Sequence, residues 1–295
     1  MLRSIEEVAE ALASEAYIAD IGLSTSLFLA LRMGKALLLE GEPGVGKTEV
    51  AKVLSRVFAT ELIRLQCYEG IDVAQAVYEW NYPRQLLELQ ARREHGDGAH
   101  LHTEGIYSEA FLLKRPLLQA IDAANERAPV LLIDELDRAD EEFESFLLEL
   151  LSDFQITIPE LGTLRARHRP IVIITSNRTR ELHDALKRRC VYHWIDYPTP
   201  QKELEIVRRK LPGVGARLAE QLVAFIQAAR RQDLAKPPGV AETLDWAEAL
   251  TYLNAEELSP AIVDATLGMI LKYQDDVDTL RGELAARLLE ETTDR

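Results

Sequence analysis

A glycine-rich segment of the chain combines the residue types that bind a polyphosphate group. Its sequence, Gly41-Glu42-Pro43-Gly44-Val45-Gly46-Lys47-Thr48, has the spacing of a phosphate-binding loop. Gly44 and Gly46 let the backbone turn so that its N–H groups point inward and favour an anion. Lys47 can place a charge on the outer phosphates, and the Thr48 hydroxyl is a ligand for Mg²⁺. The alternative is a glycine turn that binds nothing.

We expect the nucleotide contacts to cover the loop and the first residue beyond it. These positions are Glu42, Pro43, Gly44, Val45, Gly46, Lys47, Thr48 and Glu49. The apolar run that precedes the loop predicts a buried strand, and the spacing of Val50, Val53, Leu54 and Val57 after it predicts a helix. A strand, this loop and a helix in that order are the context that phosphate binding requires.

A pair of carboxylates at the end of a second apolar run forms another candidate site. Val130-Leu131-Leu132-Ile133 predicts a buried parallel strand, and Asp134 and Glu135 follow it directly. Ligands of open α/β sheets bind at the carboxyl ends of the strands. There Asp134 can hold Mg²⁺ through its water shell, and Glu135 can polarise an attacking water molecule. The alternative is a strand that ends in two solvated acids.

An amide follows the next buried strand of the chain. Ile171-Val172-Ile173-Ile174 predicts that strand, which ends in Thr175, Ser176 and Asn177. If it lies beside the strand of Asp134, the Asn177 side chain can orient a water molecule at the same edge of the sheet.

Three consecutive cations, Lys187, Arg188 and Arg189, come next. They form either a solvated patch or positive charge that reaches the terminal phosphate of a nucleotide. The sequence leaves both interpretations open.

These groups require a sheet that brings them to one edge. Apolar runs predict five strands, at 36–39, 62–67, 129–135, 171–177 and 191–195. Helical patterns alternate with them, which indicates an α/β fold with a parallel sheet.

The sequence also predicts where the core is interrupted and where it ends. We expect an irregular insertion at about 78–109, a helix over 110–125 and a β-hairpin at about 154–169. A helix capped by Asp140 carries a glutamate-rich face, including Glu144, that we interpret as solvated. Beyond the prolines at 198 and 200 the pattern is helical, so we expect a core domain over 1–198 and a smaller all-α lid over 199–295. The helices expected in the lid cover about 201–210, 216–231, 240–253, 260–273 and 275–290.

Composition limits the classes of function. The chain has 295 residues, 47% of them hydrophobic, and a formal net charge of −15, which argues against a protein that binds nucleic-acid backbones. Cys67 and Cys190 lie in apolar sequence and suggest buried, reduced thiols rather than a disulfide framework. No apolar run approaches the roughly 20 residues that a membrane span needs. We therefore expect a cytoplasmic protein without a membrane span.

A histidine-containing stretch invites a metal interpretation. His95, His100 and His102 have carboxylates nearby, but their spacing matches no standard site, and the glycines between them are typical of a solvated loop. We favour the loop.

In this order, the phosphate loop, the Asp134-Glu135 strand, the Asn177 strand and the arginine pair resemble the AAA+ ATPases over nearly the whole chain. The insertion and the hairpin are similar to those of the MoxR-type branch. The segments LLLEGEPGVGKTEVAK, LLIDELDRAD and RRCVYHWIDYP are similar to MoxR proteins encoded near molybdenum-containing carbon monoxide dehydrogenases. The resemblance implies a P-loop AAA+ αβα core followed by a helical lid.

The resemblance also implies residue roles in the hydrolysis of ATP with Mg²⁺. Lys47 and Thr48 would be the Walker A pair, Asp134 and Glu135 the Walker B pair, and Asn177 the first sensor.

Three further positions follow from the same resemblance. Arg189, with Arg188 as a close alternative, would be the arginine finger, and Gln66 would restrain the catalytic glutamate. The family usually places a second-sensor arginine at the start of a lid helix, whereas this chain has Glu242 there.

The resemblance suggests a ring, most simply a hexamer, that remodels a protein client. Its implied partners are a protein with a von Willebrand A-type domain and a metalloenzyme client. The alternative is a nucleic-acid motor, which the net charge opposes but which Arg165, Arg167 and Arg169 in the hairpin could serve by lining a pore. A small-molecule kinase fits the long helical C-terminal region poorly.

Overall fold

The computed structural model describes residues 2–94 and 105–293. The histidines at 95, 100 and 102 lie outside the described residues. The chain divides into two compact units, which we describe separately. Unit 1 comprises Met1–Val8, Ile21–Glu40 and Thr48–His193, and unit 2 comprises Ala9–Asp20, Gly41–Lys47 and Trp194–Arg295.

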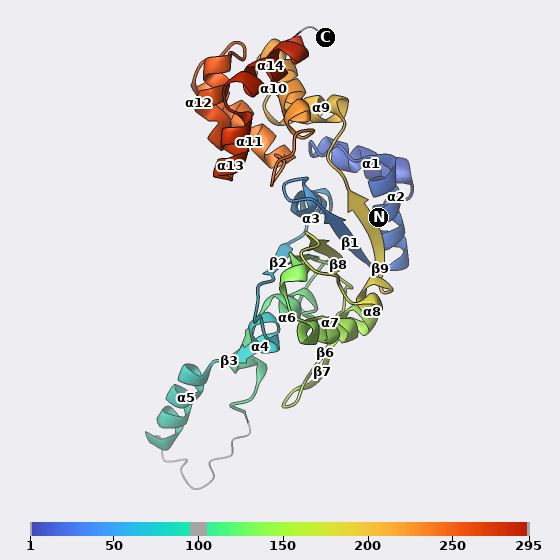
Figure 1. Cartoon of the computed structure of the whole chain (residues 1–295). Coiled ribbons are helices and arrows are strands. Elements are labelled where there is room, and N and C mark those ends of the chain that lie inside the picture. The colour runs from blue at the N-terminus through green and yellow to red at the C-terminus, as the bar shows by residue number, and fades with distance from the viewer. Residues whose placement is uncertain (1, 95–104, 294–295) are drawn as a thin grey trace. The chain divides into compact units, whose positions relative to one another are not determined.

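Figure 1 labels the elements in chain order. The helices are α1 (Ile5–Ser14), α2 (Ile21–Met33), α3 (Lys47–Val57), α4 (Val73–Ala76), α5 (Tyr82–Glu94), α6 (Pro116–Ala120), α7 (Glu141–Asp153), α8 (Asp184–Lys187), α9 (Pro200–Lys210), α10 (Ala216–Ala229), α11 (Val240–Tyr252), α12 (Pro260–Ile270), α13 (Gln274–Leu280) and α14 (Glu283–Thr293). The strands are β1 (Ala36–Gly41), β2 (Leu62–Gln66), β3 (Tyr78–Trp80), β4 (Leu112–Lys114), β5 (Val130–Asp134), β6 (Gln155–Ile158), β7 (Gly162–Arg165), β8 (Ile171–Ser176) and β9 (Cys190–Ile195). Short 3₁₀ turns cover Glu109–Phe111 and Leu136–Arg138.

A five-stranded sheet forms the centre of the core. Its strand order is β2-β5-β8-β1-β9, and the pairs β2–β5, β5–β8 and β1–β8 are parallel. Strands β1 and β5 are buried along their whole length, as their unbroken apolar runs predict for strands covered on both faces. The expected α/β fold and its five strands are confirmed.

The register of the sheet aligns the ends of its strands. Gln66 pairs with Asp134, and Ile133 pairs with Ile174, so β2, β5 and β8 end side by side. Polar residues that follow these strands therefore meet at one edge, although they are far apart in the sequence.

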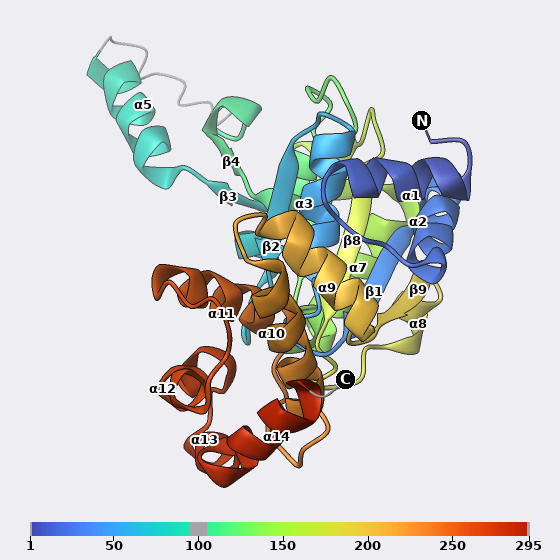
Figure 2. The same cartoon turned by 90° about the horizontal axis from the view of Figure 1, so that it is seen from above.

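Two small antiparallel pairs interrupt the core. Strands β6 and β7 form the expected hairpin, with Ile156 opposite Leu164. Strands β3 and β4 bracket α5, which extends away from the sheet in both views (Figures 1 and 2).

The expected helix over 110–125 is wrong. The segment pairs as β4 with β3 and then forms α6, which begins at Pro116. Proline has no N–H to donate and disfavours a helical conformation in the residue before it, so a helix begins here instead of continuing.

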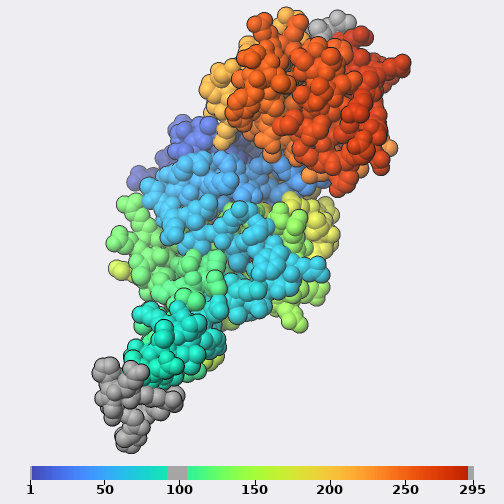
Figure 3. Space-filling model, turned by 90° about the vertical axis from the view of Figure 1, so that its left-hand side faces the viewer, coloured from blue at the N-terminus to red at the C-terminus, as the bar shows by residue number. Residues whose placement is uncertain are grey.

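The helices of unit 2 enclose a separate core, which includes Phe225 and Trp246, and the space-filling view shows them as one closely packed body (Figure 3). The expected helices 201–210, 216–231, 240–253 and 260–273 correspond to α9, α10, α11 and α12. The single helix expected over 275–290 is instead two, α13 and α14, because Gly282 between them has a positive φ of 77°.

A buried ion pair joins three helices of unit 2. Arg230, at the end of α10, makes two hydrogen bonds to the Glu203 carboxylate of α9, at 2.6 and 2.7 Å. The Thr243 hydroxyl of α11 donates to the same carboxylate at 2.7 Å, and the Arg230 Nε donates to the carbonyl of Pro238 at 2.7 Å. This network fixes the segment that leads into α11.

Candidate functional site

Asp134, at the end of β5, is a buried carboxylate held by three side chains of unit 1. Its Oδ1 accepts hydrogen bonds from the hydroxyls of Thr48 (3.0 Å) and Thr175 (2.6 Å). Its Oδ2 accepts two from the Arg64 guanidinium, at 3.0 Å from Nε and 2.5 Å from Nη2. A buried carboxylate requires such partners, because an unpaired charge in the interior is costly.

Glu135 follows Asp134 in a backbone conformation that is unusual for a residue with a side chain. Its φ of 55° lies in the left-handed region, and its N–H donates to the Thr175 hydroxyl at 2.9 Å. Such conformations cost of order 1 to 3 kcal/mol and concentrate at functional sites. The Glu135 Oε2 accepts a hydrogen bond from the Gln66 amide at 3.2 Å and pairs with the Arg138 Nε at 2.9 Å.

Asp137, which sequence reasoning missed, fixes the loop that carries Asn177. Its carboxylate accepts hydrogen bonds from the N–H of Asn177 (3.1 Å) and from the N–H and hydroxyl of Thr179 (2.9 and 2.7 Å). Burial raises the pKa of Asp137, but these hydrogen bonds outweigh it and leave the pKa below its usual value. Asn177 is thereby held at the end of β8, next to the end of β5.

The phosphate loop belongs to unit 2, and Thr48 is the next residue along the chain. Gly44 and Gly46 have φ values of 78° and 95°, which residues with a Cβ rarely adopt. The Lys47 ammonium donates to the loop's own carbonyls, those of Gly41 at 2.6 Å and Glu42 at 2.8 Å. These bonds hold the lysine side chain against the backbone of its own loop.

The start of α11 contacts the same loop within unit 2. The carbonyl of Gly44 accepts the N–H groups of Val240 (3.0 Å) and Ala241 (3.2 Å). A Cβ on Gly44 would lie 2.8 Å from the Glu242 Oε2, which itself accepts the Gly239 N–H at 3.0 Å. Glu242 therefore caps α11 and places a carboxylate against the phosphate loop.

The three consecutive cations differ in their surroundings. Lys187 pairs with Glu181 at 2.7 Å. The Arg189 guanidinium donates to the Ser152 hydroxyl at 2.7 Å and to the Ala185 carbonyl at 3.0 Å. Arg188 is exposed, and its guanidinium has no hydrogen bond or ion pair with any other described residue.

Glu144 anchors the segment that carries these cations, contrary to the expected solvated position. It is 1% exposed, accepts the His183 N–H at 2.8 Å and pairs with Arg180 at 2.5 Å. The burial of Glu144 could not be predicted from the sequence, because other glutamates surround it on α7.

Both cysteines are free thiols, and Cys67 is buried as expected, whereas Cys190 is only half-buried. Burial raises the pKa of Cys67 to about 12, and the charges of Asp134, Asp137 and Glu135 add to the effect. Burial also raises the pKa of Cys190 to about 12, against a smaller opposite influence of Lys35. Protonated thiols are poor nucleophiles and metal ligands, and among the described residues no group of three His, Cys, Asp or Glu side chains is arranged to hold a metal.

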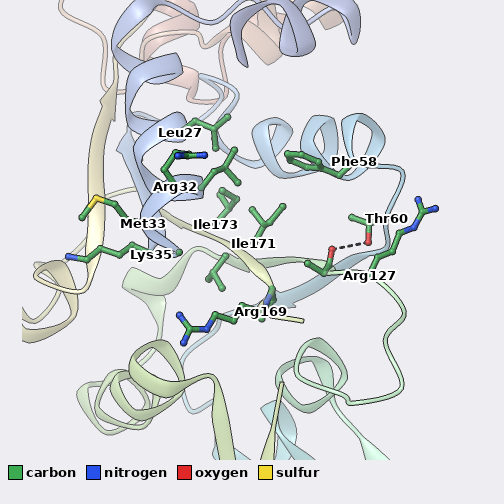
Figure 4. Close-up of a pocket in the computed structure, with 16 residues that line it drawn as sticks. Leu27, Arg32, Met33, Lys35, Phe58, Thr60, Arg127, Arg169, Ile171 and Ile173 are labelled. Atoms are coloured by element: carbon green, nitrogen blue, oxygen red, sulfur yellow. Dashed lines mark hydrogen bonds between the residues drawn. The ribbon is translucent and has the colours of Figure 1, made fainter. Parts of the chain in front are cut away.

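A pocket of about 530 Å³ lies at the opposite, amino end of β8 (Figure 4). Ile171 and Ile173 contribute to its apolar lining, and the Thr60 hydroxyl donates to the Ala128 carbonyl at its edge. It is separate from the Asp134 cluster, since that cluster sits where β5 and β8 end.

The fold and these clusters define a nucleotide-hydrolysing protein of the phosphate-loop class. The family profile described as "AAA domain (dynein-related subfamily)" matches residues 36–190, slightly more than half of the chain. The chain belongs to this AAA family, and it is an ATPase.

Other similarities include one to a further protein sequence and two to solved structures. An uncharacterized protein of Staphylococcus aureus (strain USA300) is 24% identical over 245 residues, which cover 79% of this chain and 84% of that protein. A RuvB mutant from Thermotoga maritima is 21% identical, with a TM-score of 0.49 over 93% of this chain and 74% of that chain. An inferred ATPase from Cytophaga hutchinsonii is 16% identical, with a TM-score of 0.47 over 98% and 93% of the two chains.

No described helix is both long enough and apolar enough to cross a membrane.

Proposed function

We propose that the chain is a MoxR-type AAA+ ATPase that uses ATP hydrolysis to remodel a protein client. The observation that carries the proposal is the cluster of Thr48, Asp134 and Glu135 at the carboxyl ends of the strands. It supplies a hydroxyl and a carboxylate for a hard cation and a second carboxylate for an attacking water molecule.

The residues present fit Mg²⁺. The Thr48 Oγ1 and the Asp134 Oδ1 lie 3.0 Å apart, and oxygen donors of this kind are those that Mg²⁺ prefers. When bound, Mg²⁺ would neutralise charge on the β- and γ-phosphates.

The chain's own residues would perform the remaining steps. The N–H groups of the phosphate loop and the Lys47 ammonium would bind the phosphates of ATP. Glu135 would accept the proton of the attacking water, and Asn177 would orient that water. An arginine of a neighbouring subunit would stabilise the charge that develops on the γ-phosphate.

That arginine is Arg188 or Arg189 in this proposal, and the surroundings of the two side chains favour Arg188. Arg189 already donates to Ser152 and Ala185, so its use would break two hydrogen bonds. Arg188 is exposed and has no such bond to lose within the described residues. The active form would then be a ring, most simply a hexamer.

An exposed apolar surface supports a protein partner. On α5, Tyr82, Leu86 and Leu87 are 58%, 60% and 66% exposed. Large apolar side chains grouped on one exposed helix are more typical of a protein contact than of a nucleic-acid contact. The proposal also includes two partners, a von Willebrand A-domain protein and a metalloenzyme client such as a molybdenum-containing carbon monoxide dehydrogenase. It includes a cytoplasmic location as well. The two domains, 1–198 and 199–295, are also part of it.

A Glu135→Gln protein that holds ATP without hydrolysing it should retain its client. Affinity capture from native cells with this variant, compared with Lys47→Ala, tests the proposal. Proteins enriched only with the ATP-holding variant would be client candidates, and loss of that enrichment in a Leu86→Ser/Leu87→Ser background would support α5 as the contact.

The alternative, a nucleic-acid motor, predicts a different result. Salt-dependent binding of a DNA or RNA oligomer that is lost on replacing Arg165 and Arg167 would support it. The absence of such binding at low salt would support the protein remodeller.

A further inference from the structure

A continuous hydrogen-bonded chain links the two carboxylates of the site through β2. The Arg64 Nη2 donates both to the Asp134 Oδ2 and to the Gln66 Oε1, each at 2.5 Å. The Gln66 amide nitrogen in turn donates to the Glu135 Oε2 at 3.2 Å. The order is Asp134, Arg64, Gln66, Glu135.

The alternation of side chains along β2 explains how this series of hydrogen bonds forms. Ile63 and Leu65 point into the core, so Arg64 and Gln66, two residues apart, share the opposite face of β2. Gln66 pairs directly with Asp134 in the register, whereas Arg64 pairs with Leu132 and its long side chain extends along the strands to reach Asp134. Both side chains therefore meet the Asp134-Glu135 pair from one neighbouring strand.

Arg64 is the cation that balances Asp134. The other two donors to this carboxylate are neutral hydroxyls, whereas the guanidinium brings a full charge. The Asp134 side chain is 3% exposed and that of Arg64 is 51% exposed. Because half of the Arg64 side chain is already in solvent, its guanidinium can leave the carboxylate with little loss of burial.

We propose that Arg64 is a positioning residue whose guanidinium pairs with Asp134 in place of a divalent cation. When a cation binds Asp134, the displacement of Arg64 changes the hydrogen bond between Gln66 and Glu135. The proposal rests on the function given above, in which Asp134 holds the nucleotide-bound metal. A metal at Asp134 reduces the attraction between that carboxylate and Arg64. The guanidinium then shifts, Gln66 shifts with it, and one of the two groups that hold the Glu135 Oε2 is withdrawn. The other, Arg138, comes from the following turn and is independent of β2.

This coupling is reciprocal. If metal binding displaces Arg64, then the Arg64 charge competes with the metal for Asp134, and its removal should strengthen metal binding. A purely structural ion pair predicts weaker metal binding, because loss of Arg64 would leave Asp134 poorly positioned for the metal.

The test measures the Mg²⁺ concentration at half-maximal binding of a fluorescent, non-hydrolysable ATP analogue. Arg64→Gln removes the charge and leaves a shorter side chain that still carries an amide donor. Arg64→Lys keeps the charge. We expect Arg64→Gln to lower the Mg²⁺ midpoint roughly five- to tenfold, and Arg64→Lys to leave it within about twofold of wild type.

Arg115→Gln is the matched control. Arg115 pairs with Glu79 at 2.5 Å, and the Arg115 side chain is 45% exposed, so it resembles Arg64 in its own exposure and in pairing with a carboxylate. It lies outside the cluster, and its partner Glu79 is 49% exposed. Its midpoint should equal that of wild type, and thermal unfolding of each variant checks that it is folded.

A double-mutant cycle tests the link to Gln66. Gln66→Ala should lower the Mg²⁺ midpoint of analogue binding in the wild-type background. It should have no further effect on that midpoint in the Arg64→Gln background. Equal effects in both backgrounds would overturn the link.

An unchanged or higher midpoint in Arg64→Gln, with wild-type binding still dependent on Mg²⁺, would overturn the role of Arg64 and leave the proposed function standing. If Arg64→Gln does not fold, Gln66→Ala decides, since an unchanged midpoint there overturns the inference. If wild-type binding shows no dependence on Mg²⁺, the metal–nucleotide assignment fails, and the inference fails with it.

Discussion

The Thr48 hydroxyl donates a hydrogen bond to the Asp134 carboxylate at 3.0 Å, although 86 residues separate them in the chain. This bond joins the residue after the phosphate-loop lysine to the end of β5. In the proposed mechanism both oxygens would serve the same hard cation, and this contact is the observation that supports their joint role.

Replacing Thr48 by valine should reduce ATP hydrolysis by about a hundredfold or more, because the hydroxyl that the metal needs is lost while the shape is kept. The nucleotide should also require more Mg²⁺ for binding. Steady-state phosphate release and a Mg²⁺ titration measure the two effects. Thr60→Val is the control, because the Thr60 hydroxyl bonds to the Ala128 carbonyl at the other end of the sheet. Equal losses in both variants would contradict the assignment.

Glu135→Gln should bind ATP with near wild-type affinity but hydrolyse it about 10² to 10⁴ times more slowly, because an amide cannot accept the proton of water. Equilibrium binding and phosphate release separate the two quantities. Glu142→Gln, an exposed change on α7, should be silent in both. Hydrolysis at the wild-type rate would move the role of the base to another residue.

Much of this site could be predicted from the sequence, because its groups directly follow apolar runs. Asp134, Glu135 and Asn177 each lie at the end of such a run, and register alone then brings them together. Arg64 and Asp137 were missed for a physical reason. Arg64 reaches its partner across strands, and Asp137 bonds to backbone N–H groups about 40 residues away. Neither contact leaves a local pattern in the sequence.

The same reasoning explains why the helix expected over 110–125 was predicted wrongly. The apolar spacing over 110–125 fits a helix, but Leu112 pairs with Trp80 across the insertion. A strand pairing of this kind depends on residues some 30 positions away, so local periodicity could not reveal it.

Glu242→Gln should tighten ATP binding severalfold while leaving hydrolysis within a few-fold of wild type. The Glu242 carboxylate lies against Gly44 of the phosphate loop, so its charge opposes that of the phosphates, whereas the amide can still accept the Gly239 N–H. The binding constant is measured at low and moderate salt. Glu248→Gln on the exposed face of α11 is the control. Weaker ATP binding in Glu242→Gln would show that this carboxylate supports the loop.

Asp137 should make part of the stability dependent on acid pH. Its pKa is lowered in the folded state, so its contribution is present above the unfolded value, near 3.9, and is lost as pH falls through the lower folded value. Asp137→Asn should therefore be less stable at pH 7 and should lose less further stability between about pH 5 and pH 3. Denaturant unfolding at each pH measures the difference. If the free energy of unfolding fell equally with pH in the wild type and in Asp137→Asn, the role of Asp137 would be contradicted.

The last prediction concerns the arginine that completes a neighbouring site. Arg188→Ala should reduce ATP hydrolysis by about 10³-fold, because a trans arginine can contribute 10³ to 10⁵ in rate. Arg189→Ala is the matched control from the adjacent position. It removes hydrogen bonds to Ser152 and Ala185, so it should lower the melting temperature with a much smaller loss of activity.

Mixing separates a trans role from a structural one. Arg188→Ala and Glu135→Gln should each be nearly inactive alone, since one lacks the arginine and the other lacks the base. A mixed ring contains interfaces at which an intact Glu135 faces an intact Arg188, so activity should return to a fraction of the wild-type rate. Subunit exchange is verified independently with labelled proteins. If subunits exchange and no activity returns, the arginine does not act in trans. If Arg189→Ala rather than Arg188→Ala shows this inactivity and rescue, the finger is Arg189, and its hydrogen bonds to Ser152 and Ala185 must break when the ring forms.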